Sequence, residues 1–188
     1  MAVLSAKEGE KQMEKAKVHI YCGDGKGKTT AAIGLSVRSC GRGWPVVLSQ
    51  FLKGSTSGEL NVLRTLPDYH YIPAPTTTCK FIFQMTEQEK ADYGRQVRRH
   101  FADTLEAVEK YHAKLLVLDE VLDAVAMGML SDEELADFLR NRPADLEVVM
   151  TGRAPTPCTD PLADYITRMQ KVRHPFDQGL NARQGVEF

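Results

Sequence analysis

A glycine-rich segment between a short apolar run and a helix-forming stretch limits the fold of this chain more than any other feature. It reads Gly-Asp-Gly-Lys-Gly-Lys-Thr-Thr over residues 23–30, and it follows the β-prone run at residues 18–21. Closely spaced glycines let backbone N–H groups converge on anionic oxygens, and a helix N-terminus adds partial positive charge. A strand, such a loop and a helix in this order predict a loop that binds phosphate groups.

Within the loop, the side chains have separate expected roles. Lys28 would neutralise phosphate charge, and Thr29 would offer its hydroxyl to Mg²⁺ or Mn²⁺. A glycine-rich turn without a ligand is the alternative, but a simple turn does not need two lysines and two threonines beside three glycines. The residues expected to contact the nucleotide here are Gly23, Gly25, Lys26, Gly27, Lys28, Thr29 and Thr30.

The loop departs from the usual phosphate-loop pattern, G-x-x-x-x-G-K-[ST]. That pattern would need glycine at position 22, where this chain has Cys22, and only three residues separate Gly23 from Gly27. The loop is therefore one residue short. We expect a shortened loop to hold phosphates in a different register, which weakens the case for ordinary transfer of a γ-phosphoryl group.

Strand and helix signals alternate along the rest of the chain. Strands are expected at residues 18–21, 46–48, 115–118 and 146–150, and helices at 28–40, 57–66, from 86 onward and from 131 onward. Ser57 is an expected N-cap, and Thr86 with Glu89 and Ser131 with Glu134 form expected capping boxes. Strands separated by helices predict an α/β fold, with a mostly parallel sheet covered by helices on both faces, as in P-loop NTPases of RecA-like type.

Length and composition fit one domain. We expect a polar N-terminal arm at residues 1–16 and a single P-loop α/β domain that binds nucleotide at 17–188. A net charge of -1 argues against a general nucleic-acid binder, and no apolar run approaches the ~18 residues of a membrane helix. Four widely spaced cysteines are typical of a reduced, cytoplasmic protein.

A pair of acidic residues follows the apolar run at 115–118. Asp119 or Glu120 could bind Mg²⁺ directly or through water, as in the second nucleotide motif of P-loop proteins. The pair could instead cap the next helix. Spacing alone does not decide which acid would be the direct ligand.

The motifs leave several functions open. No N/T-K-x-D segment is present, which argues against a GTPase. A P-loop ATPase with Glu120 activating water, or a small-molecule kinase, remains compatible with the fold. A non-catalytic carrier protein is disfavoured, because Lys28, Thr29 and Glu120 are all present.

Several segments together resemble the P-loop family of ATP:corrinoid adenosyltransferases, from about residue 18 to 188. The segments that carry the resemblance are the short loop at 23–30, Gln50-Phe51-Leu52-Lys53-Gly54, Glu59, Val117-Leu118-Asp119-Glu120, Thr151-Gly152-Arg153, His174-Pro175-Phe176-Asp177 with Gly179, and Ala182-Arg183-Gln184-Gly185-Val186-Glu187. The resemblance implies that the Co(I) centre of a corrinoid attacks the 5′ carbon of ATP and that triphosphate leaves. It also implies a reversed triphosphate, which would fit the short loop.

The same resemblance implies further site residues and partners. Lys28 and Arg153 would act on the leaving phosphates, and Arg38 would contact nucleotide. Phe81 and Phe83 would displace the lower axial ligand of Co(II), although both could be core residues of an edge strand. The expected partners are cobalamin or a precursor corrinoid, a reduced flavoprotein as electron donor, and a second copy of the chain.

Overall fold

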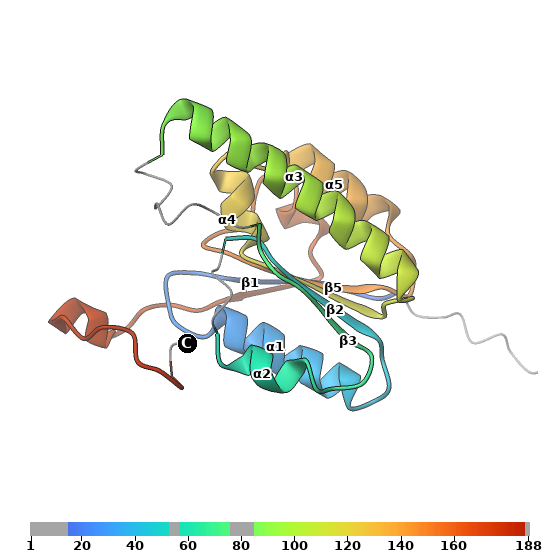
Figure 1. Cartoon of the computed structure of the whole chain (residues 1–188), viewed down its shortest axis with the longest axis horizontal. Helices are drawn as coiled ribbons and strands as arrows, with labels where there is room; N and C mark the ends of the chain where they lie inside the picture. Colours follow the sequence, from blue (N-terminus) through green and yellow to red (C-terminus); the bar gives the residue numbers. More distant parts are fainter. Residues whose placement is uncertain (1–14, 53–56, 76–84, 187–188) are drawn as a thin grey trace, which may run out of the picture.

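Six parallel strands form one continuous sheet in the computed structural model, which describes residues 15–52, 57–75 and 85–186 (Figure 1). The strand order is β3-β2-β4-β5-β1-β6. The bounds are β1 Val18–Cys22, β2 Val46–Gln50, β3 Tyr69–Ile72, β4 Leu115–Asp119, β5 Glu147–Thr151 and β6 Tyr165–Arg168. All neighbouring pairs are parallel, which confirms the predicted type of sheet.

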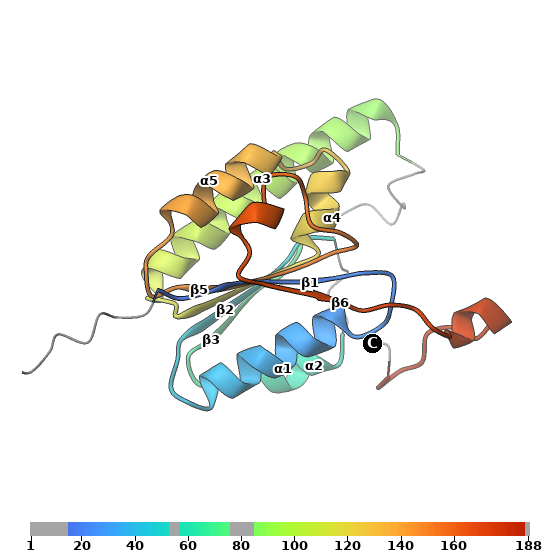
Figure 2. The same cartoon turned by 180° about the vertical axis from the view of Figure 1, so that it is seen from behind.

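Helices cover both faces of the sheet, as predicted. Helices α1 (Lys28–Cys40) and α2 (Glu59–Leu63) lie on one face, and α3 (Glu87–Lys110), α4 (Val121–Ala126) and α5 (Asp132–Asn141) lie on the other (Figures 1 and 2). Each face has its own apolar core. Strands β2 and β4 are buried at every position, as expected for central strands covered on both sides. The chain therefore has the α/β, P-loop NTPase-like architecture.

Local sequence signals set the starts of the long helices. The Thr86 hydroxyl accepts the Glu89 N–H and the Glu89 carboxylate accepts the Thr86 N–H, which confirms that capping box. Ser131 caps α5 by accepting the Glu134 N–H, but the Glu134 side chain does not bond back to the Ser131 N–H, so only half of that predicted capping box forms. The N-cap expected at Ser57 is wrong: α2 begins after Gly58, which provides no side-chain cap, and the Ser57 hydroxyl bonds to the Glu59 carboxylate instead.

Two edge strands were not predicted from the sequence. Strand β3 is half-exposed and follows Pro67 and Asp68, and β6 is exposed at all four positions, so neither has the apolar pattern of a buried strand. The predicted arm at residues 1–16 lies almost entirely outside the described residues. Within the described ranges, no helix has the length and apolar character needed to cross a membrane.

Candidate nucleotide site

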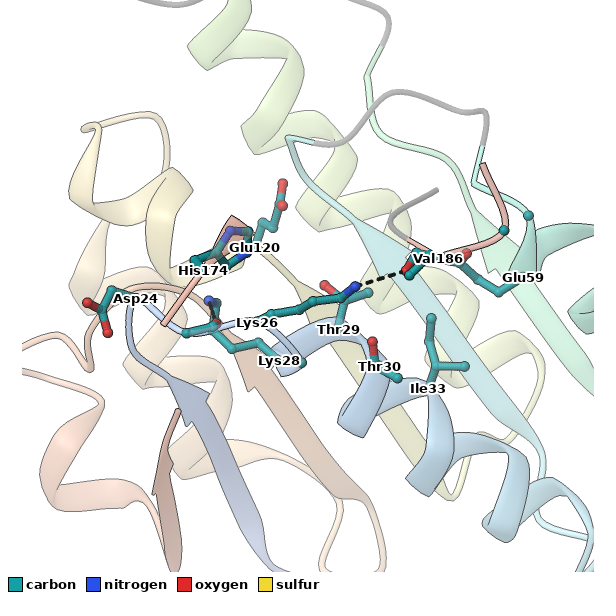
Figure 3. Close-up of a pocket in the computed structure, with 14 residues that line it drawn as sticks. Asp24, Lys26, Lys28, Thr29, Thr30, Ile33, Glu59, Glu120, His174 and Val186 are labelled. Atoms are coloured by element: carbon teal, nitrogen blue, oxygen red, sulfur yellow. Dashed lines mark hydrogen bonds between the residues drawn. The ribbon is translucent and has the colours of Figure 1, made fainter. Parts of the chain in front are cut away.

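A pocket of about 550 Å³ opens at the carboxyl edge of the sheet, where ligands bind in open α/β folds (Figure 3). The phosphate loop forms its floor, and segments far apart in the sequence form its walls. The lining residues are Asp24, Gly25, Lys26, Gly27, Lys28, Thr29, Thr30, Ile33, Gly58, Glu59, Glu120, His174, Gly185 and Val186. Of the loop residues expected to contact nucleotide, all except Gly23 therefore line this pocket.

Two glycines of the loop, Gly23 and Gly25, lie too close to neighbouring backbone to carry a side chain. Gly23 has φ 112° and its N–H donates to the Arg153 carbonyl at 2.9 Å. A Cβ at this position would lie 2.2 Å from the carbonyl oxygen of Met169. The Gly25 N–H donates to the same Met169 oxygen at 2.8 Å. The segment after β6 thus lies directly against the loop and fixes its path.

The loop leads into the N-terminus of α1. Gly27 is the N-cap at φ 117°, and no side chain caps the first turn, so its N–H groups are available to an anion. Lys28 is half-buried, and its ammonium group donates to the Gly25 carbonyl at 2.9 Å. Backbone donors and two lysines therefore give the pocket the character of a phosphate site.

The two acids after β4 have different positions. Asp119 is fully buried beneath the loop, where its Oδ1 accepts the hydroxyl of Thr29 at 2.9 Å and that of Thr151 at 2.8 Å. Glu120 lines the pocket, at φ 64°, with its N–H donating to the Thr151 hydroxyl at 2.8 Å. Glu120 is thus placed to meet a ligand, whereas Asp119 contacts Thr29.

The donor set in the pocket fits a hard divalent cation. The Thr29 hydroxyl and the Glu120 carboxylate lie on the same pocket and are oxygen ligands of the kind Mg²⁺ prefers. Among the described residues, no three His, Cys, Asp or Glu side chains form a metal-binding group. A site with one or two protein oxygens suits Mg²⁺ that is also bound by phosphates.

Two expected arginines lie off this pocket. The Arg153 side chain is exposed beside a separate hollow next to α4, and its main-chain N–H donates to the Asp123 carboxylate at 2.9 Å. Arg38 is exposed in the last turn of α1, about 15 Å along the helix from Lys28. Phe81 and Phe83 lie outside the described residues.

Asp24 is the negatively charged member of the loop. Its carboxylate accepts the Lys171 N–H at 3.0 Å, and this bond holds the pKa of Asp24 below its usual value. In Figure 3 the Asp24 side chain points away from Lys26. The Asp24 carboxylate is therefore held by a main-chain donor from the segment after β6.

The C-terminal segment supplies pocket residues that were not among the predicted site residues. His174, Gly185 and Val186 line the pocket, and the Lys26 ammonium donates to the Val186 carbonyl at 3.2 Å (Figure 3). The His174 Nδ1 accepts the Phe176 N–H at 3.1 Å. The resemblance at residues 174–187 marked this segment as characteristic, but nothing in its composition placed it on the phosphate loop.

Comparison with known proteins identifies the family. The family model described as ATP:corrinoid adenosyltransferase BtuR/CobO/CobP matches residues 14–188. The corrinoid adenosyltransferase CobA of Salmonella typhimurium is 31% identical over 98% of this chain and 92% of its own length. The corrinoid adenosyltransferase of Pseudomonas aeruginosa is 34% identical over 100% of this chain and 91% of its own.

A solved structure, the KaiC-like protein PH0186 from Pyrococcus horikoshii, matches with a TM-score of 0.49 and 15% identity over 83% of this chain and 73% of that chain. The family assignment rests on the sequence matches, which span nearly the whole chain. This chain therefore belongs to the ATP:corrinoid adenosyltransferase family and is an enzyme that transfers an adenosyl group to a corrinoid.

Proposed function

We propose that this enzyme transfers the 5′-deoxyadenosyl group of ATP to the Co(I) centre of a corrinoid and releases intact triphosphate. The electron pair of Co(I) forms the bond to C5′, the bond between C5′ and its oxygen breaks, and triphosphate leaves with the electron pair of that broken C–O bond. Cobalt is thereby oxidised to Co(III), and the nucleophile needs no general base. The observation that carries the proposal is the short phosphate loop, which opens with Lys28 and Thr29 into one pocket containing Glu120.

In this proposal the protein acts by positioning ATP and by stabilising the charge of the leaving group. Lys28 and the N–H groups at the start of α1 bind the triphosphate. The Thr29 hydroxyl and the Glu120 carboxylate hold Mg²⁺ or Mn²⁺, with Asp119 acting through Thr29. When bound, the metal ion neutralises negative charge on the phosphate oxygens.

The remaining site residues are proposed from a backbone contact with the loop or from the family resemblance. Arg153 is proposed as a phosphate contact because its carbonyl accepts from Gly23 of the loop, while its exposed side chain lies beside α4. Arg38 is proposed as a nucleotide contact, and Phe81 and Phe83 as corrinoid contacts, on the family resemblance alone. The same resemblance is the ground for proposing that cobalamin or a precursor corrinoid is the acceptor and that a reduced flavoprotein donates the electrons.

The oligomeric state, the domain organisation and the cellular location of the enzyme are also proposals. We propose a homodimer in which the arm at residues 1–16 covers the corrinoid, while residues 17–188 form one domain. Its three cysteines in the described ranges are free thiols, which favours a reduced, cytoplasmic setting.

An anaerobic assay tests the reaction. ATP and Mg²⁺ are supplied with and without chemically reduced corrinoid, the light-sensitive Co–C product is followed by absorbance, and phosphates are separated by chromatography. We expect triphosphate in the same amount as the alkylated corrinoid, and nearly inert ATP when corrinoid is left out. ADP and orthophosphate forming at comparable rates in both mixtures would instead indicate an ATPase in which Glu120 activates water.

A further inference from the structure

A continuous chain of hydrogen bonds runs from edge strand β3 to the phosphate loop. Tyr71 Oη donates to Gln50 Oε1 at 2.8 Å, and Gln50 Nε2 donates to Asp119 Oδ2 at 3.2 Å. The other carboxylate oxygen, Oδ1, accepts the Thr29 hydroxyl. Gln50 and Asp119 are fully buried and face each other in register between β2 and β4. Because these two groups are shielded from solvent, water does not readily substitute for a lost partner.

The direction of each bond in this chain is fixed. A carboxylate only accepts hydrogen bonds, so Gln50 must present its amide NH₂ to Asp119 and its amide oxygen to Tyr71. If the amide turned over, two oxygens would face each other in a buried space. Burial raises the pKa of Tyr71, so its hydroxyl keeps the proton that it donates. Asp119 therefore sets the orientation of the Gln50 amide, and Tyr71 holds the amide in that orientation by donating to its oxygen.

The last bond of the chain sets the direction of the Thr29 hydroxyl. Because its proton points down to Asp119, the lone pairs of Oγ1 are left to face the pocket, where a cation can use them. We propose that Tyr71 and Gln50 are positioning residues that orient the Thr29 hydroxyl, through Asp119, for metal-bound ATP. This inference rests on the proposed function, in which Thr29 binds the metal ion.

A second tyrosine on the same strand provides a matched control. Tyr69 lies two residues from Tyr71 on the same face of β3, and its hydroxyl bonds to the Ser36 hydroxyl of α1 at 2.7 Å. Tyr69→Phe and Tyr71→Phe each remove one oxygen from a hydrogen bond in the same strand. Of these two tyrosines, only Tyr71 is linked to Asp119 through hydrogen bonds. An effect that comes only from weakening β3 would therefore appear in both variants, whereas an effect on Asp119 would appear in Tyr71→Phe alone.

The test is calorimetric titration of each variant with ATP, once with Mg²⁺ and once with a chelator. We expect Tyr71→Phe to weaken binding of Mg²⁺-ATP about 3- to 10-fold, as for loss of one hydrogen bond, and to leave binding of metal-free ATP unchanged. Tyr69→Phe should change neither. In turnover assays, the Mg²⁺ concentration for half-maximal rate should rise in Tyr71→Phe, while the rate at saturating Mg²⁺ stays near that of the parent enzyme.

A double variant tests whether Tyr71 acts only through Gln50. Gln50→Met removes the donor to Asp119 and should weaken Mg²⁺-ATP binding at least as much as Tyr71→Phe. If the effect passes through Gln50, adding Tyr71→Phe to Gln50→Met should cause no further loss. Thermal unfolding of all variants identifies any that fail to fold. If Gln50→Met fails to fold, comparison of the two single variants Tyr71→Phe and Tyr69→Phe still tests the positioning role.

The outcomes separate this inference from the proposed function. If the parent enzyme binds ATP more tightly with Mg²⁺ and Tyr71→Phe behaves like Tyr69→Phe, the positioning role is wrong and the proposed function stands. Equal weakening of Mg²⁺-ATP and metal-free ATP in Tyr71→Phe would also overturn it. If Mg²⁺ does not affect ATP binding even in the parent enzyme, both the metal site and the positioning role fail.

Discussion

The pocket base and the C-terminal cover differ in how they are held. The base comprises residues 23–30 with Asp119 and Glu120, and its buried groups are bonded to the ends of neighbouring strands. The cover comprises residues 169–186 and is exposed along most of its length, with Val172 91% and Phe176 70% exposed. In Figures 1 and 2, the short helix Pro175–Gln178 lies away from the sheet.

Hydrogen bonds join the cover to the base near both ends of the cover. Near its start, the Met169 carbonyl and the Lys171 N–H bond to Gly25 and Asp24, and near its end the Val186 carbonyl accepts from Lys26. Regions with few buried contacts open more easily than the core. We therefore expect changes in the base to affect folding and catalysis most, and changes in the contacts of the cover to affect ligand affinity more weakly.

The largest effect is expected where base and cover touch, at Gly23. Gly23→Ala places a methyl group 2.2 Å from the Met169 carbonyl oxygen at a positive φ, so it should reduce the free energy of unfolding by about 2–5 kcal/mol. Gly27→Ala is the matched control, because its φ is similar but its Cβ would meet only the Met169 sulfur, at 3.5 Å. Urea unfolding should show a smaller loss for Gly27→Ala. Equal losses of unfolding free energy in the two variants would mean that the segment after β6 shifts at little cost and does not fix the path of the loop.

Next in size is Lys28→Ala, in the base. Loss of one charge-assisted contact with triphosphate is worth roughly 1.5–3 kcal/mol, so activity should fall at least tenfold. Unfolding should change little, since the ammonium group is half-buried and bonds to a loop carbonyl. Single-turnover assays with pre-reduced corrinoid, together with thermal unfolding, measure both quantities. Near-normal turnover in the variant would contradict the assignment of residues 23–30 as a phosphate-binding loop.

Lys26→Ala tests the other lysine of the loop, which contacts the cover. Its side chain is exposed and donates to the Val186 carbonyl, so we expect about two- to fivefold weaker ATP binding and unchanged folding. Titration calorimetry beside Lys28→Ala gives the comparison directly. If the two lysine variants lose the same affinity, Lys26 contacts the phosphates as directly as Lys28 does, and its bond to the cover does not weaken that role.

The smallest effect is expected for Asp24→Asn. The Asn side-chain oxygen can still accept the Lys171 N–H, so thermal stability near neutral pH should not change. The Lys171 bond lowers the pKa of Asp24 in the folded state, so its contribution to stability is present above the unfolded pKa of 3.8 and is lost as the pH falls through the lower folded value. Thermal unfolding measured from about pH 6 to about pH 3 should show different stabilities for the parent enzyme and Asp24→Asn only at the acid end of this range. A difference already present at neutral pH would show that Asp24 has another partner.

Local patterns explain which parts could be predicted from the sequence. The phosphate loop and α1 follow from adjacent residues, and β4 follows from a run of apolar residues ending in two acids. The family resemblance identified the reaction class. Each of these signals is contained in a short stretch of chain, so no knowledge of distant contacts was needed.

The parts that were missed depend on distant contacts. Strand β6 has no buried position, and it is held by pairing with β1, about 150 residues earlier in the chain. The assignment of roles to Asp119 and Glu120 needed the position of Thr151, and the pocket residue His174 needed the path of the cover. Arg153 shows the converse, because a strand-end position suggested the pocket but its side chain lies beside α4.

The position of β1 between β5 and β6 also affects how the protein folds during synthesis. The strand that leads into the phosphate loop is made early, but both of its partners lie more than a hundred residues later. Until about residue 170 has left the ribosome, the loop lacks the carbonyl of Met169 that accepts from Gly25. Such non-local pairing makes folding slow and leaves early strands exposed. Nascent chains shorter than this should therefore not bind ATP, however much of the glycine-rich loop they already contain.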